Sequence, residues 1–230
     1  MPERPTDQEL IEEVKSLLEG FRSEFVDHLE SAHSTPRTRL LQIFEVWKQL
    51  NLRRIVDLAD AAIPMFEQSR LVPGCALTLG GFETVAIQYY IHKKMVEHTE
   101  KSDPELLHKL FLSALFGRRD DASWPETAIQ VLTAIDHMDK EFKMLRGEYD
   151  HLCEYAHPNL KGGFGAYARQ EAEELEVNFG SNPLDLDMAT WGLVPLHIIL
   201  VIAAEINNRL SNFYSNFVAL AEKYSPDHPL

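Results

Sequence analysis

The segment from Arg146 to Asn159 gathers the residue types in this chain that are best suited to chemistry. Its apolar spacing predicts a helix over most of its length. At about 100° per residue, Asp150 and His157 lie within about 40° of Arg146 around such a helix, whereas His151 lies about 140° away. We therefore expect Arg146, Asp150 and His157 to share one face, with His151 pointing elsewhere.

An arginine and a histidine on one face are suited to cleaving a phosphodiester. The imidazole titrates near neutral pH and can take or give a proton, and the guanidinium neutralises charge that grows on the phosphoryl oxygens. The candidate catalytic residues are therefore Arg146 with His157 or His151, and Asp150 to orient either partner. A structural interpretation stays open: Arg146 and Asp150 as an i,i+4 surface ion pair, and His157 as a residue that binds helix-end carbonyls.

Metal binding is a rival chemistry, because a Glu-x-x-His spacing supplies ligands to di-iron centres in helical bundles. The spacing occurs three times, at Glu30/His33, Glu105/His108 and Glu154/His157. The first pair falls at a predicted helix end, and the second lies in a first turn, where acids are favoured anyway. A di-metal carboxylate bundle is thus the least favoured hypothesis, and we expect no metal and no other cofactor.

Glu83 stands among apolar neighbours, including Phe82 and Val85. A carboxylate in such surroundings must find a partner or shift its pKa upward. We expect it to accept a hydrogen bond from a Tyr, His or Arg of another helix, in preference to a catalytic role.

The elements that position these residues are predicted to be almost entirely helical. Apolar residues recur at steps of three and four over about 10–29, 36–65, 74–95, 104–116, 123–142, 145–157 and 183–224. The stretches 164–169 and 175–179 have a weak alternation that fits a small hairpin. The fold class is therefore all-α: a single helical bundle of about seven helices, with a small β-hairpin insertion near 164–179, forming one domain over 1–230.

Several helix ends have sequence signals. Asp103-Pro104-Glu105 and Gly117 predict the start and end of one helix, and Ser123 to Glu126 fits a capping box for the next. Pro64 and Pro195 are expected to bend or end their helices.

Composition excludes several classes of protein. With 36 acidic against 22 basic side chains, the net charge of −14 disfavours broad nucleic-acid binding and binding to anionic membranes. The two cysteines, Cys75 and Cys153, fit a reducing compartment, and the first residues lack a signal-peptide pattern. The uncharged run from Met188 to Ala204 suits a central core helix or a homodimer interface better than a membrane span. We expect a cytoplasmic protein with no membrane contact.

Two segments resemble signatures of a bacterial all-helical family that has no assigned activity. Gly80-Gly81-Phe82-Glu83-Thr84-Val85-Ala86 is similar to its R-x-L-x-E-x-x helix, and Tyr149 to Asn159 resembles its Y-x-x-L-S-E-Y-x-H-P-N motif. The likeness covers about residues 75–165.

More loosely, the chain resembles the HEPN superfamily of RNA-cleaving toxins and phage-defence effectors, since Arg146 and His151 fit its R-x4-H spacing. Gly147 departs from the polar residue usual after the Arg. The resemblance implies metal-independent RNA cleavage at a dimer interface. The leading hypothesis is a HEPN-like endoribonuclease acting on an RNA substrate as a homodimer. The alternative is a non-catalytic helical module that binds a protein partner, and the two are about equally favoured.

Overall fold

The computed structural model describes residues 5–29, 36–117, 128–170, 176–180 and 186–222. Within these ranges the elements are α1 (Asp7–Arg22), α2 (Pro36–Glu67), α3 (Leu71–Glu100), α4 (Pro104–Phe116), α5 (Val131–Glu141), α6 (Leu145–Ala156), η1 (Leu160–Gly165), β1 (Ala168–Gln170), β2 (Val177–Phe179), η2 (Ala189–Leu193) and α7 (Val194–Ala221). The segments η1 and η2 are π-helical. The predicted all-α bundle with a small hairpin is confirmed.

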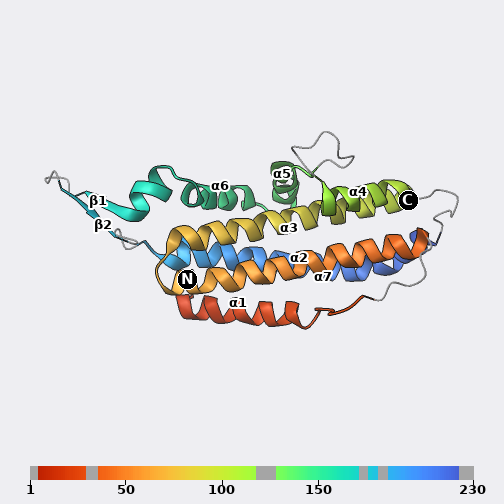
Figure 1. The fold of residues 1–230 in the computed structure, drawn as a ribbon, viewed down its shortest axis with the longest axis horizontal. Coiled ribbons are helices and arrows are strands. Elements are labelled where there is room, and N and C mark those ends of the chain that lie inside the picture. The colour runs from red at the N-terminus through yellow and green to blue at the C-terminus, as the bar shows by residue number, and fades with distance from the viewer. Residues whose placement is uncertain (1–4, 30–35, 118–127, 171–175, 181–185, 223–230) are drawn as a thin grey trace.

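Helix α3 is the central element of the bundle. It packs on α2 and α7 on one side and on α4, α5 and α6 on the other. The three short helices follow one another along α3, whereas α1, α2 and α7 run along the length of the molecule (Figure 1). The hairpin and η1 project from one end of this arrangement.

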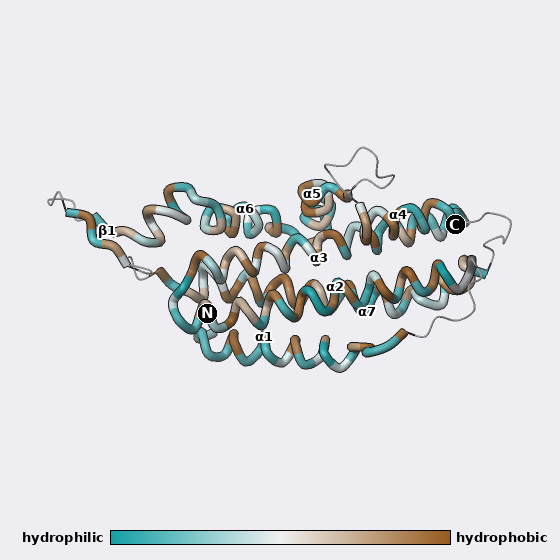
Figure 2. The backbone as a smooth tube through the Cα atoms, viewed as in Figure 1, coloured by the Kyte–Doolittle hydropathy of each residue, from teal (hydrophilic) through white to brown (hydrophobic). Residues whose placement is uncertain are grey.

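One continuous core of buried apolar side chains joins the helices. Apolar residues recur along all the long helices, alternating with polar ones (Figure 2). At one level of the bundle the rings of Phe44, Trp47, Phe111 and Phe217 pack with centroids 5.1–6.1 Å apart. Because these rings come from α2, α4 and α7, this aromatic cluster fixes helices that are distant in sequence.

The predicted ends of α4 are confirmed. The Asp103 side chain accepts from the backbone N–H of Leu106 at 3.0 Å, and Gly117 is the C-cap. Helix α5 begins at Val131 with Gln130 as its N-cap, so the start predicted for this helix at 123–126 is wrong; residues 123–126 themselves lie outside the described residues.

The effects of the prolines on their helices differ from the prediction. Helix α2 continues through Pro64 to Glu67, so the expected end comes one turn later. Pro73 lies in the first turn of α3, where its missing N–H has no intrahelical partner to lose. At Pro195 the predicted break is a change from the π-helical turns of η2 to the α-helix α7.

The ring of Phe66 is enclosed between two glycines at the end of the bundle that carries the hairpin. A Cβ on Gly74 would lie 2.3 Å from that ring, and a Cβ on Gly192 would lie 2.1 Å from it. Only glycine at these two positions therefore lets α2, α3 and η2 come this close to one another. A cavity of about 70 Å³ between Ser69–Pro73 and Ala166–Tyr167 lies where the hairpin segment meets the start of α3.

Helices α3 and α7, the latter extended by η2, are long and apolar enough to cross a membrane. In each, 56% of the most apolar window is buried inside the bundle, and α7 packs on α1, α2 and α3. This is the core position predicted for the last helix; the cytoplasmic location stays a prediction.

Candidate functional site

Arg146 lies in the first turn of α6 and connects that helix to α5. Its backbone N–H donates to Asp139 Oδ1 at 3.0 Å. Its Nε donates to both carboxylate oxygens of Asp150, at 2.9 and 3.1 Å, and its Nη1 donates to Asp136 Oδ1 at 2.7 Å. The predicted i,i+4 ion pair is therefore present, with a second carboxylate from α5.

The guanidinium of Arg146 is therefore bound by two carboxylates. Its side chain is 40% exposed, and the hydrogen bonds that it donates to Asp150 and then to Asp136 raise its pKa. The cluster of Asp136, Arg146 and Asp150 carries a net charge of −1, so an approaching phosphate meets two carboxylates for one guanidinium. The cluster is therefore better suited to connecting α5 with α6 than to binding an anion.

His151 points away from Arg146, as the helical geometry predicts. Its ring lies parallel to that of Trp191, with centroids 4.3 Å apart and 10° between the planes. Its Nε2 is buried and has no hydrogen-bond partner among the described residues. Burial, followed by the charge of Lys161, lowers the pKa of His151 and so favours its neutral form, and the ring packs on Trp191 of η2.

His157 is exposed and caps the C-terminus of α6. Its backbone N–H donates to the Cys153 carbonyl at 3.0 Å. It lies eleven residues from Arg146, which corresponds to about 16 Å along a helix. Arg146 and His157 are therefore too far apart to act on one phosphate within one molecule.

The residues that follow His157 redirect the chain. Asn159 accepts with its side chain from the backbone N–H groups of Lys161 and Gly162, at 3.0 and 2.9 Å. A Cβ on Gly162 would lie 2.2 Å from the His157 carbonyl oxygen. This part of the motif builds the tight turn into η1.

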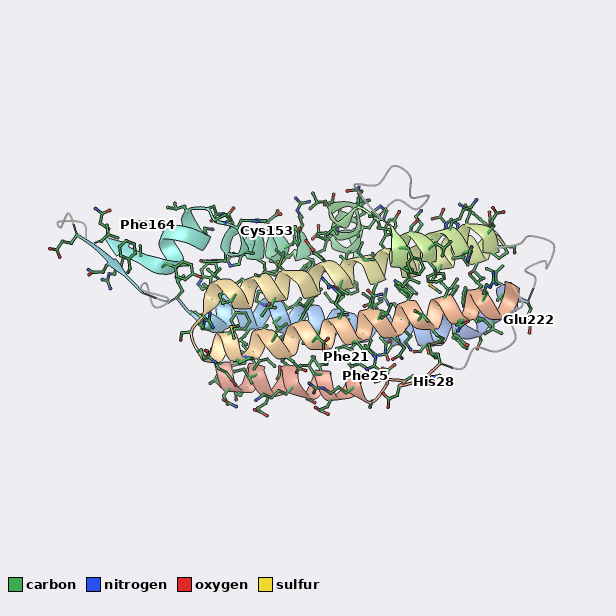
Figure 3. The ribbon with its side chains drawn as sticks, viewed as in Figure 1. Phe21, Phe25, His28, Cys153, Phe164 and Glu222 are labelled. Carbon is green, nitrogen blue, oxygen red and sulfur yellow. The ribbon has the colours of Figure 1, made fainter. Side chains whose placement is uncertain are left out.

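The two segments that carry the family resemblance contact each other. The Tyr149 hydroxyl donates to Glu83 Oε1 at 3.2 Å, and the rings of Phe82 and Tyr149 lie 5.8 Å apart. Glu83 therefore has the hydrogen-bond partner expected for it, from another helix. Cys153, labelled on α6 in Figure 3, also contacts the Tyr149 hydroxyl. These motif residues fix α6 on α3.

A second charged cluster was not found by sequence reasoning. Glu141, at the end of α5, accepts from the Tyr89 hydroxyl at 2.8 Å, from Lys93 at 2.8 Å, and from Arg209. The hydrogen bond from Lys93, followed by those from Arg209 and Tyr89, lowers the pKa of Glu141 to about 2, against the opposing effect of burial. Arg209 is shared with Glu205 on α7. We call Glu141 with its three donors the α5 junction, since it joins α3, α5 and α7.

His92 lies beside the α5 junction, 8% exposed, with its Nδ1 unpartnered among the described residues. Burial, followed by the charges of Arg209 and Lys93, lowers its pKa to about 4. Its ring packs edge-on against Phe213. No local pattern signals this group, because its members come from three helices far apart in sequence.

Metal-ligand geometry is not found in the described part of the chain. Within it, no group of three His, Cys, Asp or Glu side chains is placed to hold an ion. The pair Glu30/His33 lies outside the described residues. Cavities of about 230 and 250 Å³ lie elsewhere, one beside Lys48 and Tyr214 and one beside Tyr90 and Thr133, and both are smaller than a typical ligand site.

Four large apolar or aromatic side chains are exposed on η1 and the hairpin: Leu160, Phe164, Tyr167 and Phe179, at 76, 46, 45 and 83%. We call these four residues the end surface. Phe164 is labelled on it in Figure 3, beyond the end of α6. Polar residues surround it, among them Lys161, Arg169 and Glu176.

Comparison of the chain with family models, with curated proteins and with solved structures finds no match. The family resemblances therefore stay predictions.

Proposed function

We propose that this chain is a non-catalytic helical module that binds a protein partner through the end surface. The observation that carries the proposal is the exposure of four large side chains, Leu160, Phe164, Tyr167 and Phe179, on the part of the molecule that projects from the bundle. Large apolar side chains that gather on a surface and are surrounded by polar residues are typical of a protein interface.

The residue types of the end surface support this function. Aromatic side chains are enriched at the centres of interfaces because they bury a large area at a small cost in conformational entropy. Phe179 in particular is exposed at 83% on a strand of only three residues. Removing it from water against a partner contributes roughly 2 kcal/mol.

The contacts of α6 support the non-catalytic part of the proposal. Arg146 is held by two carboxylates, the ring of His151 lies flat on Trp191, and His157 is three turns away from the arginine. Each group that suggests catalysis therefore has a structural role or lacks a catalytic neighbour.

Site-specific photo-crosslinking in living cells tests the proposal. A photoreactive phenylalanine analogue is placed at Phe179 or Phe164, and at Leu132 or Leu50 as matched controls, because these leucines are also exposed, at 51 and 54%, on the side of the bundle. We expect a discrete crosslinked product from the two end-surface positions and none from the controls. Equal products from all four positions, or none at all, would contradict the proposal.

The ribonuclease hypothesis has its own test, which is RNA cleavage by the purified protein in excess EDTA. The proposal predicts no cleavage above background for the wild type. Cleavage that survives EDTA and is lost in Arg146→Ala and in either His151→Ala or His157→Ala would replace the proposed function with a metal-independent endoribonuclease.

A further inference from the structure

The backbone hydrogen-bonding groups along the outer edge of strand β2 can be assigned. The pairing is antiparallel, with Ala168 opposite Phe179 and Arg169 opposite Asn178. The backbone N–H of Gly180 donates to the Tyr167 carbonyl at 3.0 Å. Since hydrogen-bonded and non-hydrogen-bonded pairs alternate along such a ladder, Arg169 and Asn178 form the next hydrogen-bonded pair. The backbone groups of Val177 and Phe179 therefore point outward, away from β1.

Among the described residues no further strand pairs with the outer edge of β2, whereas β1 packs on η1. Ala168 of β1 is buried. Among the described residues, no backbone hydrogen bond outside the hairpin is made by Val177 or Phe179. A two-stranded hairpin is at best marginally stable alone, and edges of this kind pair readily with another strand.

We infer that the partner of the end surface is a second copy of this chain, bound by antiparallel pairing of β2 with β2 of that copy about a two-fold axis at Asn178. The inference rests on the proposed function, because it names the occupant of the same surface. A two-fold contact requires a strand that complements itself. With the axis at Asn178, Val177 faces Phe179 of the partner strand and Phe179 faces Val177, so the outward backbone groups meet in hydrogen-bonded pairs.

The side chains of β2 suit this pairing. Val177 and Phe179 lie on one face of the strand, so each phenylalanine would pack on a valine across the new ladder, which is a favourable cross-strand pair. Residues 177–180 are uncharged, and Glu176 would face Gly180 of the second copy. In a chain with a net charge of −14, this edge lets two copies approach without placing like charges opposite each other.

The position of the hairpin permits the assembly. It projects beyond the end of the helices (Figure 1), so two hairpins can form a four-stranded sheet with the bundles on opposite sides. That sheet has enough strands for independent stability, which the isolated hairpin lacks.

A symmetric disulfide tests the axis directly. In the inferred dimer the two Asn178 residues form a non-hydrogen-bonded pair with Cα atoms about 4.5 Å apart, a separation that allows a disulfide. The matched control, Arg169→Cys, lies three strand spacings from its copy, about 14 Å. We expect mild oxidation to convert Asn178→Cys into a covalent dimer at least about tenfold faster than Arg169→Cys or the wild type, all in a Cys153→Ser background. Equal rates would overturn the inference.

Proline variants test the hydrogen bonds. Val177→Pro removes an outward N–H and leaves the β1–β2 ladder intact, whereas Gln170→Pro removes the corresponding N–H on the edge of β1. Sedimentation of the full chain should show a dimer for the wild type and for Gln170→Pro. The dissociation constant of the Val177→Pro dimer should be at least about tenfold higher than that of the wild-type dimer. A monomeric wild type, or equal effects of the two prolines, would overturn the inference.

These outcomes separate the inference from the proposed function. If the wild type is monomeric but position 179 crosslinks to a different protein in cells, the end surface remains an interface and only the second copy is excluded. If neither a dimer nor a crosslinked product is found, both fail.

Discussion

The side chains on the outer side of α6 have partners within the chain, whereas those of the end surface are exposed to solvent. On α6, Arg146 is bound by two carboxylates and His151 lies against Trp191. On the end surface, Phe179 and Leu160 are largely in water. Residue types that suggest chemistry are therefore occupied by structural contacts, and residue types that usually build a core are left exposed. This contrast supports the proposal that the partner binds at the hairpin, while α6 contacts η1 and so positions it.

The largest loss of stability is expected when a buried phenylalanine is replaced. Phe66 is 3% exposed and enclosed by Gly74 and Gly192. Phe66→Ala leaves a cavity among three elements, so we expect the free energy of unfolding to fall by about 3–5 kcal/mol. Urea denaturation followed by circular dichroism measures it. A loss below about 1 kcal/mol would mean that α2, α3 and η2 are not held together as described.

The α5 junction should contribute more to the free energy of unfolding than the cluster of Asp136, Arg146 and Asp150. Glu141→Gln keeps the size of the side chain but removes the charge that three donors share. Because Glu141 is partly exposed, we expect a loss of about 1–2 kcal/mol in the free energy of unfolding at pH 7. Asp136→Asn is the matched variant at the other cluster.

The α5 junction also has a pH signature. The pKa of Glu141 is depressed to about 2 in the folded protein, so its contribution is present above the ordinary carboxyl pKa of about 4.5 and is lost as the pH falls toward 2. The difference in stability between wild type and Glu141→Gln should shrink across that window. A difference that stays constant from pH 6 to 2.5 would contradict this account of the α5 junction.

His92 gives a second pH dependence, in a higher window. Its pKa is lowered to about 4 by burial, so the unfolded chain binds the proton more readily and stability falls as the pH drops from about 6.5 to 4. His92→Leu should make stability less dependent on pH in that window. Thermal unfolding at intervals of half a pH unit measures it, and an unchanged slope in His92→Leu would contradict this explanation.

A small effect is expected at the Arg146 cluster. Asp136 and Asp150 are more than half exposed, and exposed ion pairs contribute little. Asp136→Asn should therefore lower the free energy of unfolding by about 0.5 kcal/mol or less, with most of the loss disappearing in 1 M salt. A loss equal to that of Glu141→Gln would remove the distinction between the two clusters.

The smallest effect on stability is expected at the end surface. Phe179→Ser should change the free energy of unfolding by less than about 0.5 kcal/mol, since the ring is 83% exposed. It should nevertheless abolish the crosslinked product formed from position 164. A large loss of stability without any change in crosslinking would make Phe179 a structural residue.

The helical fold could be predicted because its signals are local. The apolar spacing, the cap at Asp103 and the hairpin near 164–179 each depend on neighbours in sequence. Helix ends near prolines were less accurate, because a proline in a first turn does not disturb a helix: Pro73 lies inside α3. The π-helical turns of η1 and η2 have no such local signal.

The candidate site could be predicted only in part. The Arg146–Asp150 pair and the opposite direction of His151 follow from helical periodicity within α6. The stacking of His151 on Trp191 and the α5 junction depend on tertiary packing between elements that are up to about a hundred residues apart, which spacing within one helix does not reveal. The end surface has the same origin, since exposure depends on what the rest of the chain leaves uncovered.

If the end surface is an interface, replacing its aromatic side chains should reduce the size of the native assembly. Size-exclusion chromatography of fresh lysate compares the wild type with the double variant Phe164→Ser/Phe179→Ser, and with Leu50→Ser/Leu132→Ser as the control. We predict that the wild type and the control elute together as a larger species, and that the end-surface variant elutes later, at the size of the free chain. Co-elution of all three would contradict the account.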